Sequence, residues 1–543
     1  MSLLPFLVVA FGAGSLSLLT RRAERSSAAI GLVGLAAAGV LATFIGTDPP
    51  LGVAGGAIAG TTFARLFLAL GCVTGMLIVI VGLATTWPRS LPGATLIGLG
   101  AAGFALGVSD PGIAVIAATG GAVVGVLVTL VAPVTERRLV VAVRELRALV
   151  VAGALAILAG AVVVGPVGAA RADPAILGLG YVAFASAAAI RFGAIPFHLW
   201  AARVADAAPE VGLPLVMAWG PAAFLVIALA WTNGAVAASR EPLGLERGLV
   251  VAVAAASVLL GTAAALLQDD IEHIVGYSIV ADGGIALLGL AALDPAAWGP
   301  TRTWLLALVV TKTAFAAWAA AMAARFGTRR VQDLRGWAIR APVLAIALLA
   351  IVIAGVGWPG MAAFAARASL VGLVLQGPAA AALLLGAFAS VLYYGRLFAV
   401  GVARSQTVVP VAAAGAASGR APQGSDDDVP ASRPRMRPLP AWRTTRTPIG
   451  AIAVLILAGL SIAIAGGALG VAAAAEGRPP IRFETPVAGA PGQTEPTPAP
   501  SGASPAAASP GVSGAAPAAG SPSPGASAPV APASPTPARP SGS

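Results

Sequence analysis

Long apolar runs separated by short polar segments make up most of the chain as far as residue 474. About fourteen runs can be drawn, nearly all of them long enough for a helix that crosses a bilayer. Their apolar positions are continuous and do not alternate, which excludes a membrane β-barrel. In lipid the backbone must satisfy its own hydrogen bonds, so an all-α polytopic membrane protein with about 14 transmembrane helices is predicted. The approximate limits are 3–20, 27–46, 64–86, 91–108, 111–133, 139–166, 174–195, 213–232, 248–267, 275–292, 303–324, 342–376, 378–402 and 448–474.

Two of these runs are predicted to be broken helices. The run 342–376 is too long for one straight span, and it contains Gly357 and Pro359 near its middle, with further glycines on either side. Proline removes a helical hydrogen bond, and broken membrane helices expose backbone groups to a site. A second break is predicted at Gly193–Pro196, near the end of the seventh run.

Two polar segments are predicted to be disordered. Residues 403–447 form a loop rich in alanine, glycine, proline and arginine, and residues 479–543 form a tail rich in proline, alanine and serine. Such compositions offer too little apolar surface to drive folding. The last predicted span, 448–474, separates the two segments.

Arginine gathers in the loops that follow the first, third, fifth, seventh, eleventh and thirteenth runs, whereas most of the opposite loops hold few or none. The positive-inside rule then places these loops in the cytoplasm. The N-terminus and the C-terminal tail are predicted on the outer face of a cell (inner or plasma) membrane. Arg21 and Arg22 follow the first run and no basic residue precedes it, so it is expected to be a retained helix and not a cleaved signal peptide.

Composition narrows the function further. The chain is 58% hydrophobic and 10% charged, which excludes a soluble enzyme, and its net charge of +11 reflects loop arginines and not nucleic-acid binding. Cys72 is the only cysteine and lies in an apolar run, so no internal disulfide or cysteine-based metal site is expected. No flavin, iron–sulfur or haem motif is visible, so no cofactor is predicted.

Lys312 is the only lysine among 33 lysine and arginine residues. It lies inside Thr303–Ala324, an otherwise uncharged apolar run. A charge at mid-span costs roughly 2.5–3.5 kcal/mol on insertion scales and is usually functional. Lysine can release its proton when buried, whereas arginine cannot. Lys312 is therefore a candidate proton carrier, and a structural ion pair with a neighbouring carboxylate is the alternative.

Several motifs occur in a recognisable order between about residue 90 and residue 400. They are RFGAIPFHLW from Arg191 to Trp200, AAP from Ala207 to Pro209, DIEHIVGYSIVAD from Asp270 to Asp282, TKTAF around Lys312, DLRGW from Asp333 to Trp337, GWP from Gly357 to Pro359, FAAR from Phe364 to Arg367, and YYGR from Tyr393 to Arg396. In this order the chain resembles the antiporter-like membrane subunits of respiratory complex I, especially subunit N of bacterial NADH-quinone oxidoreductase. Subunits L and M and the Mrp-type cation/proton antiporters share that fold.

The resemblance implies two inverted five-helix repeats, here residues 91–232 and 248–402, after N-terminal transmembrane helices at 1–90. In the family each repeat holds a half-channel with a broken helix, and a buried glutamate and a line of lysines pass protons along the middle of the membrane. The implied partners are other membrane subunits of a complex I-like or Mrp-like assembly, protons and the lipid bilayer, and electron transfer belongs to the partners.

This chain departs from the family pattern at several charged positions. Arg191 and Arg367 stand where the family has lysines, and Gly220 stands where it has the lysine of the eighth helix. The family glutamate falls by spacing near Gly120–Gly121 and is expected to be lost. Glu145 is interpreted as an interfacial ion pair with the neighbouring arginines at a helix start.

The candidate proton pathway contains residues from both predicted repeats. They are Lys312, Asp282, His273, Arg367, Arg191 and His198. Three are expected to converge in the second repeat: Asp282, Lys312 and Arg367. Two alternatives stay open for the histidines, because His198 could simply bond carbonyls freed by the Pro196 break and His273 could form a solvated ion pair.

Three functions are compatible with these features. The leading hypothesis is a proton-translocating or proton-coupling subunit of a complex I-like oxidoreductase or cation/proton antiporter assembly. The second is a degenerate scaffold subunit that has lost transport. The third is a stand-alone transporter of a small anion, with Arg191 and Arg367 as ligands. Whether the chain counts as an enzyme subunit is left open.

Overall fold

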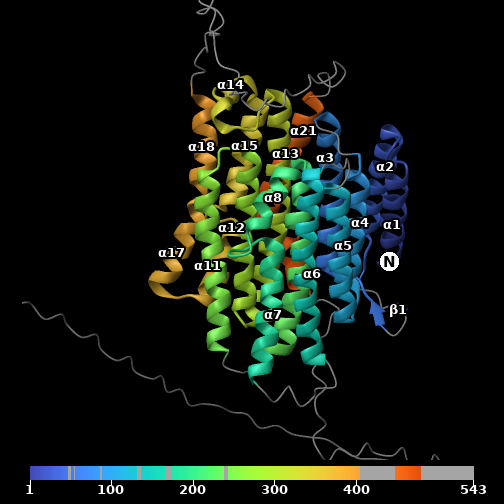
Figure 1. Ribbon diagram of the computed structural model, residues 1–543, viewed down its shortest axis with the longest axis vertical. Helices are drawn as coiled ribbons and strands as arrows, with labels where there is room; N and C mark the ends of the chain where they lie inside the picture. The colour runs from blue at the N-terminus through green and yellow to red at the C-terminus, as the bar shows by residue number, and fades with distance from the viewer. Residues whose placement is uncertain are drawn as a thin grey trace, which may run out of the picture. The chain divides into compact units, whose positions relative to one another are not determined.

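The computed structural model describes residues 1–46, 51–53, 56–85, 89–130, 136–164, 174–237, 243–403 and 447–477. Apart from residues 403 and 447, the predicted loop 403–447 and the tail 479–543 lie outside these residues, so both predictions stay untested. Figure 1 shows the helices running roughly alongside one another. The all-α polytopic prediction is confirmed, because the described part of the chain contains nine helical segments long and apolar enough to cross a membrane, with five shorter apolar helices beside them. The exact number of spans stays a prediction.

The helices follow the predicted runs closely. They are α1 (Leu4–Leu19), α2 (Glu24–Thr43), α3 (Thr62–Ala84), α4 (Leu91–Gly107), α5 (Pro111–Leu130), α6 (Glu136–Val164), α7 (Pro174–Phe192), α8 (Leu199–Ala207), α9 (Gly220–Trp231), α11 (Gly244–Leu267), α12 (Ile271–Ala291), α13 (Trp298–Phe326), α14 (Trp337–Arg340), α15 (Pro342–Val356), α16 (Ala362–Val374), α17 (Gly377–Phe388), α18 (Ser390–Val402), α21 (Thr447–Ala465) and α22 (Val471–Glu476). A π-helical turn, Leu215–Trp219, leads into α9. The sequence did not predict the small antiparallel ribbon of β1 (Leu51–Val53) and β2 (Gly56–Ile58).

Both predicted helix breaks are confirmed. α7 ends at Phe192, where Gly193 takes a left-handed φ of 63°. α15 ends at Val356, where Gly357 has a φ of 65°. Glycine adopts this conformation without the steric cost that a side chain would add, so the chain can turn sharply there.

The prediction of one continuous helix over 448–474 is wrong. α21 ends at Ala465, and the short helix α22 begins only at Val471. Gly467 and Gly470 between them have φ values of 91° and 72°. The apolar run hid this turn because glycine and alanine keep hydropathy high while glycine alone permits the left-handed backbone.

α13 lies in the centre of the bundle. Every residue of its 18-residue apolar window is buried. It packs against α3, α12, α15, α16 and α21. A helix that is apolar and buried all round is a core helix. Lys312 on α13 therefore faces protein on every side and not lipid.

α11 and α12 pack closely because glycine leaves room between their backbones. A Cβ built at Gly284 would lie 2.7 Å from the carbonyl oxygen of Ala254. Small residues allow such close approach between membrane helices. We expect Gly284→Ala to lower the free energy of unfolding by about 1–3 kcal/mol, measured by denaturant unfolding in detergent.

The matched control for this substitution is Gly395→Ala on α18. A Cβ at Gly395 meets no atom within 4 Å. Alanine is the better helix former, so this variant should be as stable as the parent or more stable by about 0.5–1 kcal/mol. Equal losses in the two variants would contradict the close-packing explanation.

Arginine side chains close several helix ends. Arg396 donates from Nη1 to the carbonyl oxygens of Leu266 (2.6 Å) and Gln268 (2.7 Å), at the end of α11. Arg247 donates to Ala291 (2.9 Å) and Leu373 (3.2 Å), which end α12 and approach the end of α16. A cation at a helix C-terminus satisfies carbonyls that lack a helical partner and balances the helix dipole. The five N–H groups of a guanidinium suit this role better than a single ammonium.

Candidate functional site

Lys312 and Asp282 form a buried ion pair between α13 and α12. Nζ of Lys312 lies 2.6 Å from Oδ2 of Asp282, and the two side chains are 1% and 14% exposed. Trp304 donates from Nε1 to the backbone carbonyl of Asp282 at 3.0 Å and ties the two helices together beside the pair. A buried charge is tolerated when it is paired in this way.

Arg367 on α16 adds a second cation to the same cluster. Its guanidinium lies over the ring of Trp304, 4.7 Å from the centroid, and interacts electrostatically with Asp282. Arg367 and Lys312 also repel each other. Two cations therefore share one carboxylate within this cluster.

The break between α15 and α16 explains where Arg367 is held. Its Nη2 donates to the carbonyl oxygen of Gly355 at 3.1 Å. In a continuous helix this carbonyl would accept from the backbone of residue 359, but Pro359 has no N–H. The broken helix thus supplies an unpaired carbonyl, and the guanidinium of Arg367 satisfies it.

Two tyrosines of α18 complete this cluster. Both Tyr393 and Tyr394 are buried, with ring centroids 4.4 Å apart. Tyr394 interacts electrostatically with Lys312, and its hydroxyl lies against Gly355. The YYGR motif is recognisable in the sequence, but the contact of Tyr394 with Lys312 was not predicted from it. The second predicted repeat therefore brings together Asp282, Lys312, Arg367 and the tyrosine pair.

Glu145 is the main correction to the sequence analysis. It is 1% exposed and belongs to the inner face of α6, whereas Arg144 and Arg147 point outward. The interpretation as an interfacial ion pair with those arginines is therefore wrong. The inner face follows the helical spacing of Ala142, Glu145 and Leu149 (i, i+3, i+7), and that periodicity could have revealed it.

Glu145 lies within electrostatic reach of Arg191 on α7. Neither carboxylate oxygen of Glu145 has a hydrogen-bond partner among the described residues. Arg191 instead donates from Nη2 to the carbonyl oxygen of Ala118 on α5 at 2.9 Å, and it lies 4.6 Å from the ring centroid of Phe224. The structure thus holds a second buried carboxylate and cation, separate from the Lys312 cluster.

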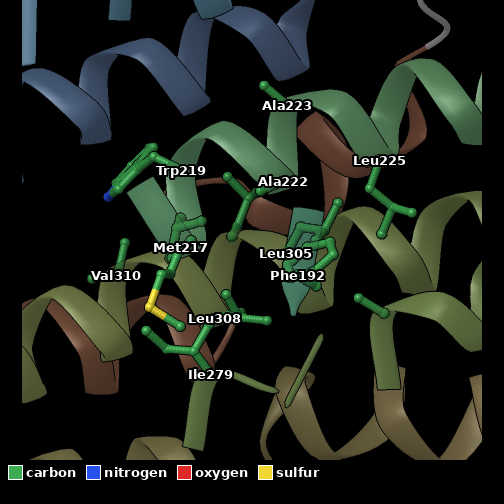
Figure 2. Close-up of a cluster of buried hydrophobic side chains, with 14 of the residues drawn as sticks. Phe192, Met217, Trp219, Ala222, Ala223, Leu225, Ile279, Leu305, Leu308 and Val310 are labelled. Carbon is green, nitrogen blue, oxygen red and sulfur yellow. The ribbon is translucent and has the colours of Figure 1, made fainter. Parts of the chain in front are cut away.

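An apolar cluster lies between these two charged groups. Figure 2 shows Phe192 of α7 and the side chains of the π turn and α9 meeting those of α12 and α13. Phe192 adjoins Arg191, and Val310 is two residues from Lys312. Gly220, where the family has a lysine, begins α9 and brings no charge into this region. A continuous charged line through both halves is absent from the described residues.

The two histidines lie away from Lys312. Nε2 of His273 is 2.9 Å from Oδ1 of Asp206, and Nδ1 is 4.0 Å from Oδ2 of Asp270. His273 lies in the first turn of α12, nine residues before Asp282 and about 14 Å from it along the helix axis. The ring of His198 lies 6.4 Å from that of Tyr277, and its Nδ1 has no hydrogen-bond partner in the described part of the chain.

A further ionic cluster near His273 was not found from the sequence. Arg329, between α13 and α14, contacts Glu210 at 2.7 Å and Glu272 at 3.0 Å, and the two glutamates are 2% and 6% exposed. Burial by itself would lower the pKa of Arg329, but the two glutamates raise it to a net value above its ordinary range. This cluster joins the segment after α8 to the start of α12 and the loop after α13.

Comparison with protein families matches residues 166–393 to the family described as NADH:quinone oxidoreductase/Mrp antiporter, TM. Curated relatives include NADH-quinone oxidoreductase subunit N of Chlorobium chlorochromatii, 30% identical over 177 residues (31% of this chain and 34% of that protein). The subunit N of Hirschia baltica is 30% identical over 241 residues (42% of this chain and 48% of that protein). Over residues 166–393 the chain is therefore similar to the antiporter-like family of membrane subunits.

The antiporter-like fold extends beyond the region of sequence similarity. A chain of the Mrp complex from Dietzia sp. DQ12-45-1b superimposes with a TM-score of 0.65 at 19% identity, covering 87% of this chain and 96% of that one. A chain of respiratory complex I from Thermus thermophilus with bound NADH gives the same TM-score and identity, covering 87% and 98%. At this identity the likeness shows the fold alone. In sequence, the alignments with these two curated relatives span about a third to a half of each relative's length.

Proposed function

We propose that this chain is a proton-translocating or proton-coupling membrane subunit, with the Asp282–Lys312 pair as its proton-transfer site. The observation that carries the proposal is the 2.6 Å contact between Asp282 of α12 and Lys312 of α13, a helix that is buried all round. Both groups of the pair can titrate, and mid-membrane ionisable pairs mark proton paths in transporters.

The chemistry follows from charge balance within the Lys312 cluster. In the resting pair the carboxylate of Asp282 balances the ammonium of Lys312. A proton arriving on Asp282 removes that balance and leaves two cations, Lys312 and Arg367, close together in a low dielectric. Arg367 stays protonated, so the repulsion is relieved when Lys312 gives up a proton. The proton on Asp282 then passes to the neutral amine of Lys312 across their contact, which restores both the carboxylate and the ammonium, and the carboxylate can accept the next proton.

We also propose the assembly and the orientation of this subunit. The relatives' names support membership of a complex I-like or Mrp-like assembly, with electron transfer belonging to other subunits. The arginine-rich loops support a multi-pass location in the plasma (inner) membrane with both ends of the chain outside. We place the inverted repeats at 91–232 and 248–402, and propose His273 as a proton entrance and a structural role for His198 in the first repeat.

Proton movement is proposed to be confined to the second repeat. Arg191 cannot release a proton, and Gly220 supplies no carrier toward Lys312. The apolar cluster of Figure 2 supports this separation, because Trp219 is its one labelled side chain with a hydrogen-bonding group, and that N–H is already donated to Oγ1 of Thr313. Glu145 and Arg191 then serve as a fixed dipole in the first repeat and not as a half-channel.

Flux in vesicles tests this proposal. Purified chain reconstituted with a trapped pH-sensitive dye should carry protons down an imposed gradient. Asp282→Asn removes the acceptor and should lower the flux at least about tenfold, the size expected for loss of a positioned proton-transfer group. Glu145→Gln is the matched control, a buried carboxylate in the other repeat, and should keep the parent flux.

Two results would overturn the proposal. No flux from the parent protein, with its partner subunits still co-purifying, would favour a scaffold. Equal losses in Asp282→Asn and Glu145→Gln would contradict confinement to the second repeat. Uptake of a small anion is not favoured, because Arg191 and Arg367 already bind backbone carbonyls and stack on aromatic rings.

A further inference from the structure

An open cleft lies at the arginine-rich end of the bundle, where α3 and α13 end and α15 and α21 begin. Its volume is about 210 Å³. Its walls are mostly small and apolar, formed by residues that include Ala84, Ala321, Ala324, Pro342, Gly450 and Ala451. Val343 and Pro448 at its rim are exposed. The four helices are neighbours in Figure 1.

The mouth of this cleft is cationic. Arg325 is the one charged residue among the described residues that line it, and its Nη2 donates to the carbonyl oxygen of Arg340 at 2.8 Å. The guanidinium of Arg340 lies over the ring of Phe326, 5.2 Å from the centroid. Both arginines are exposed, and the described residues that line the cleft include no carboxylate. The dipoles of α15 and α21, which begin here, add to the positive potential.

We propose that this cleft binds a glycerophospholipid with an anionic headgroup. The apolar walls suit an acyl chain, and the guanidiniums of Arg325 and Arg340 suit the phosphate, which they can bind through paired N–H groups. The cleft is at the ends of membrane helices, the depth at which a headgroup meets hydrocarbon. A free anion would make no apolar contact with the walls, and a lipid without net charge would gain less from the positive charge of the arginines.

The site is independent of the proton-transfer site. Arg325 lies 13 residues after Lys312 on α13, about 20 Å along the helix axis. Lipid in the cleft would contact α3, α13, α15 and α21 together and so hold the ends of four helices that are far apart in sequence. A failure of the lipid-binding proposal would therefore leave the proton-transfer proposal for Lys312 unaffected.

Native mass spectrometry of the full chain tests lipid binding, with dioleoyl phosphatidylglycerol and dioleoyl phosphatidylcholine as probes. The parent should prefer the anionic lipid by roughly fivefold for each arginine at the mouth. The double variant Arg325→Gln/Arg340→Gln should lose this preference. Ala451→Phe places a ring in the cleft and should weaken binding of both lipids. Arg335→Gln removes an exposed charge outside the cleft and should bind as the parent does.

Three outcomes would overturn the lipid proposal. One is an equal preference for the anionic lipid in the parent and in the double variant. Another is competition by glycerol phosphate, which lacks acyl chains, at concentrations like those of the lipid, because that would indicate a site for a free anion. The third is unchanged binding in Ala451→Phe. Melting temperatures of all variants, measured in the same detergent, exclude loss of folding as the cause of a change.

Discussion

Lys312→Arg is expected to remove proton flux while leaving the protein folded. Arginine keeps the positive charge opposite Asp282, so the ion pair survives, but it does not release a proton at any accessible pH. Lys312 is fully buried, and the larger guanidinium should cost about 1–3 kcal/mol through overpacking. Flux in dye-loaded vesicles and the free energy of unfolding in detergent measure the two effects separately.

Lys312→Met provides the complementary measurement. It removes the cation and leaves the carboxylate of Asp282 buried and unpaired, which should cost about 3–5 kcal/mol. Adding Asp282→Asn removes the stranded charge and should recover most of that stability, but not the flux. If Lys312→Arg conducted protons at the parent rate, the positive charge of Lys312 and not its titration would be the required property.

Arg329→Met is expected to destabilise the fold by a similar amount, about 3–5 kcal/mol. The substitution leaves two carboxylates, Glu210 and Glu272, unpaired in a site where they are 2% and 6% exposed. It also releases the contact between the segment after α8 and the start of α12. Denaturant unfolding in detergent measures the loss, and adding Glu210→Gln and Glu272→Gln should recover it.

The pH dependence of stability in the parent and in Arg329→Met follows from the direction in which the fold shifts the pKa of Arg329. The pKa of Arg329 is raised in the fold, so its stabilisation is fully present below the unfolded pKa and is lost only as pH rises through the still higher folded pKa. The parent should therefore show no loss from this group in the usable range. Arg329→Met should regain stability in acid, as protonation neutralises the stranded carboxylates.

Arg330→Met is the matched control for this second prediction. Arg330 is the next residue and is exposed, and it donates a hydrogen bond from its backbone N–H to Oγ1 of Thr328. Its substitution should change stability by no more than about 0.5 kcal/mol. A loss equal to that of Arg329→Met would indicate a general effect of positive charge at this end of the bundle.

The use of arginine at several helix ends, and of lysine at position 312, has a structural cause. Arg247, Arg367 and Arg396 donate to carbonyls at helix ends or at a helix break, where a permanent cation with several N–H groups is useful. Lys312 contacts a side-chain carboxylate instead. Arg329 also pairs with carboxylates, but in the loop after α13, whereas the partner of Lys312 lies in the middle of α12.

Local chemistry was enough to predict the helices and two of the three helix breaks. Apolar length indicates a span because hydrocarbon requires a self-bonded backbone, and Gly193, Gly357 and Pro359 act on the backbone where they stand. The turn at Gly467 was missed because the residues around it are small and apolar, so hydropathy gives no sign of a break there. Lys312 was also recognisable from the chain alone, since a charge in an apolar helix is costly wherever its partners lie.

The partners themselves depended on how distant helices pack. Glu145 looked interfacial beside Arg144 and Arg147, and only the packing of α6 turned it inward toward Arg191. The ion pairs of Arg329 with Glu210 and Glu272 join residues more than fifty positions apart in sequence. Ion pairs between helices follow from rotation and contact of whole helices, which sequence spacing does not encode, so the pairing of Lys312 with Asp282 became definite only in three dimensions.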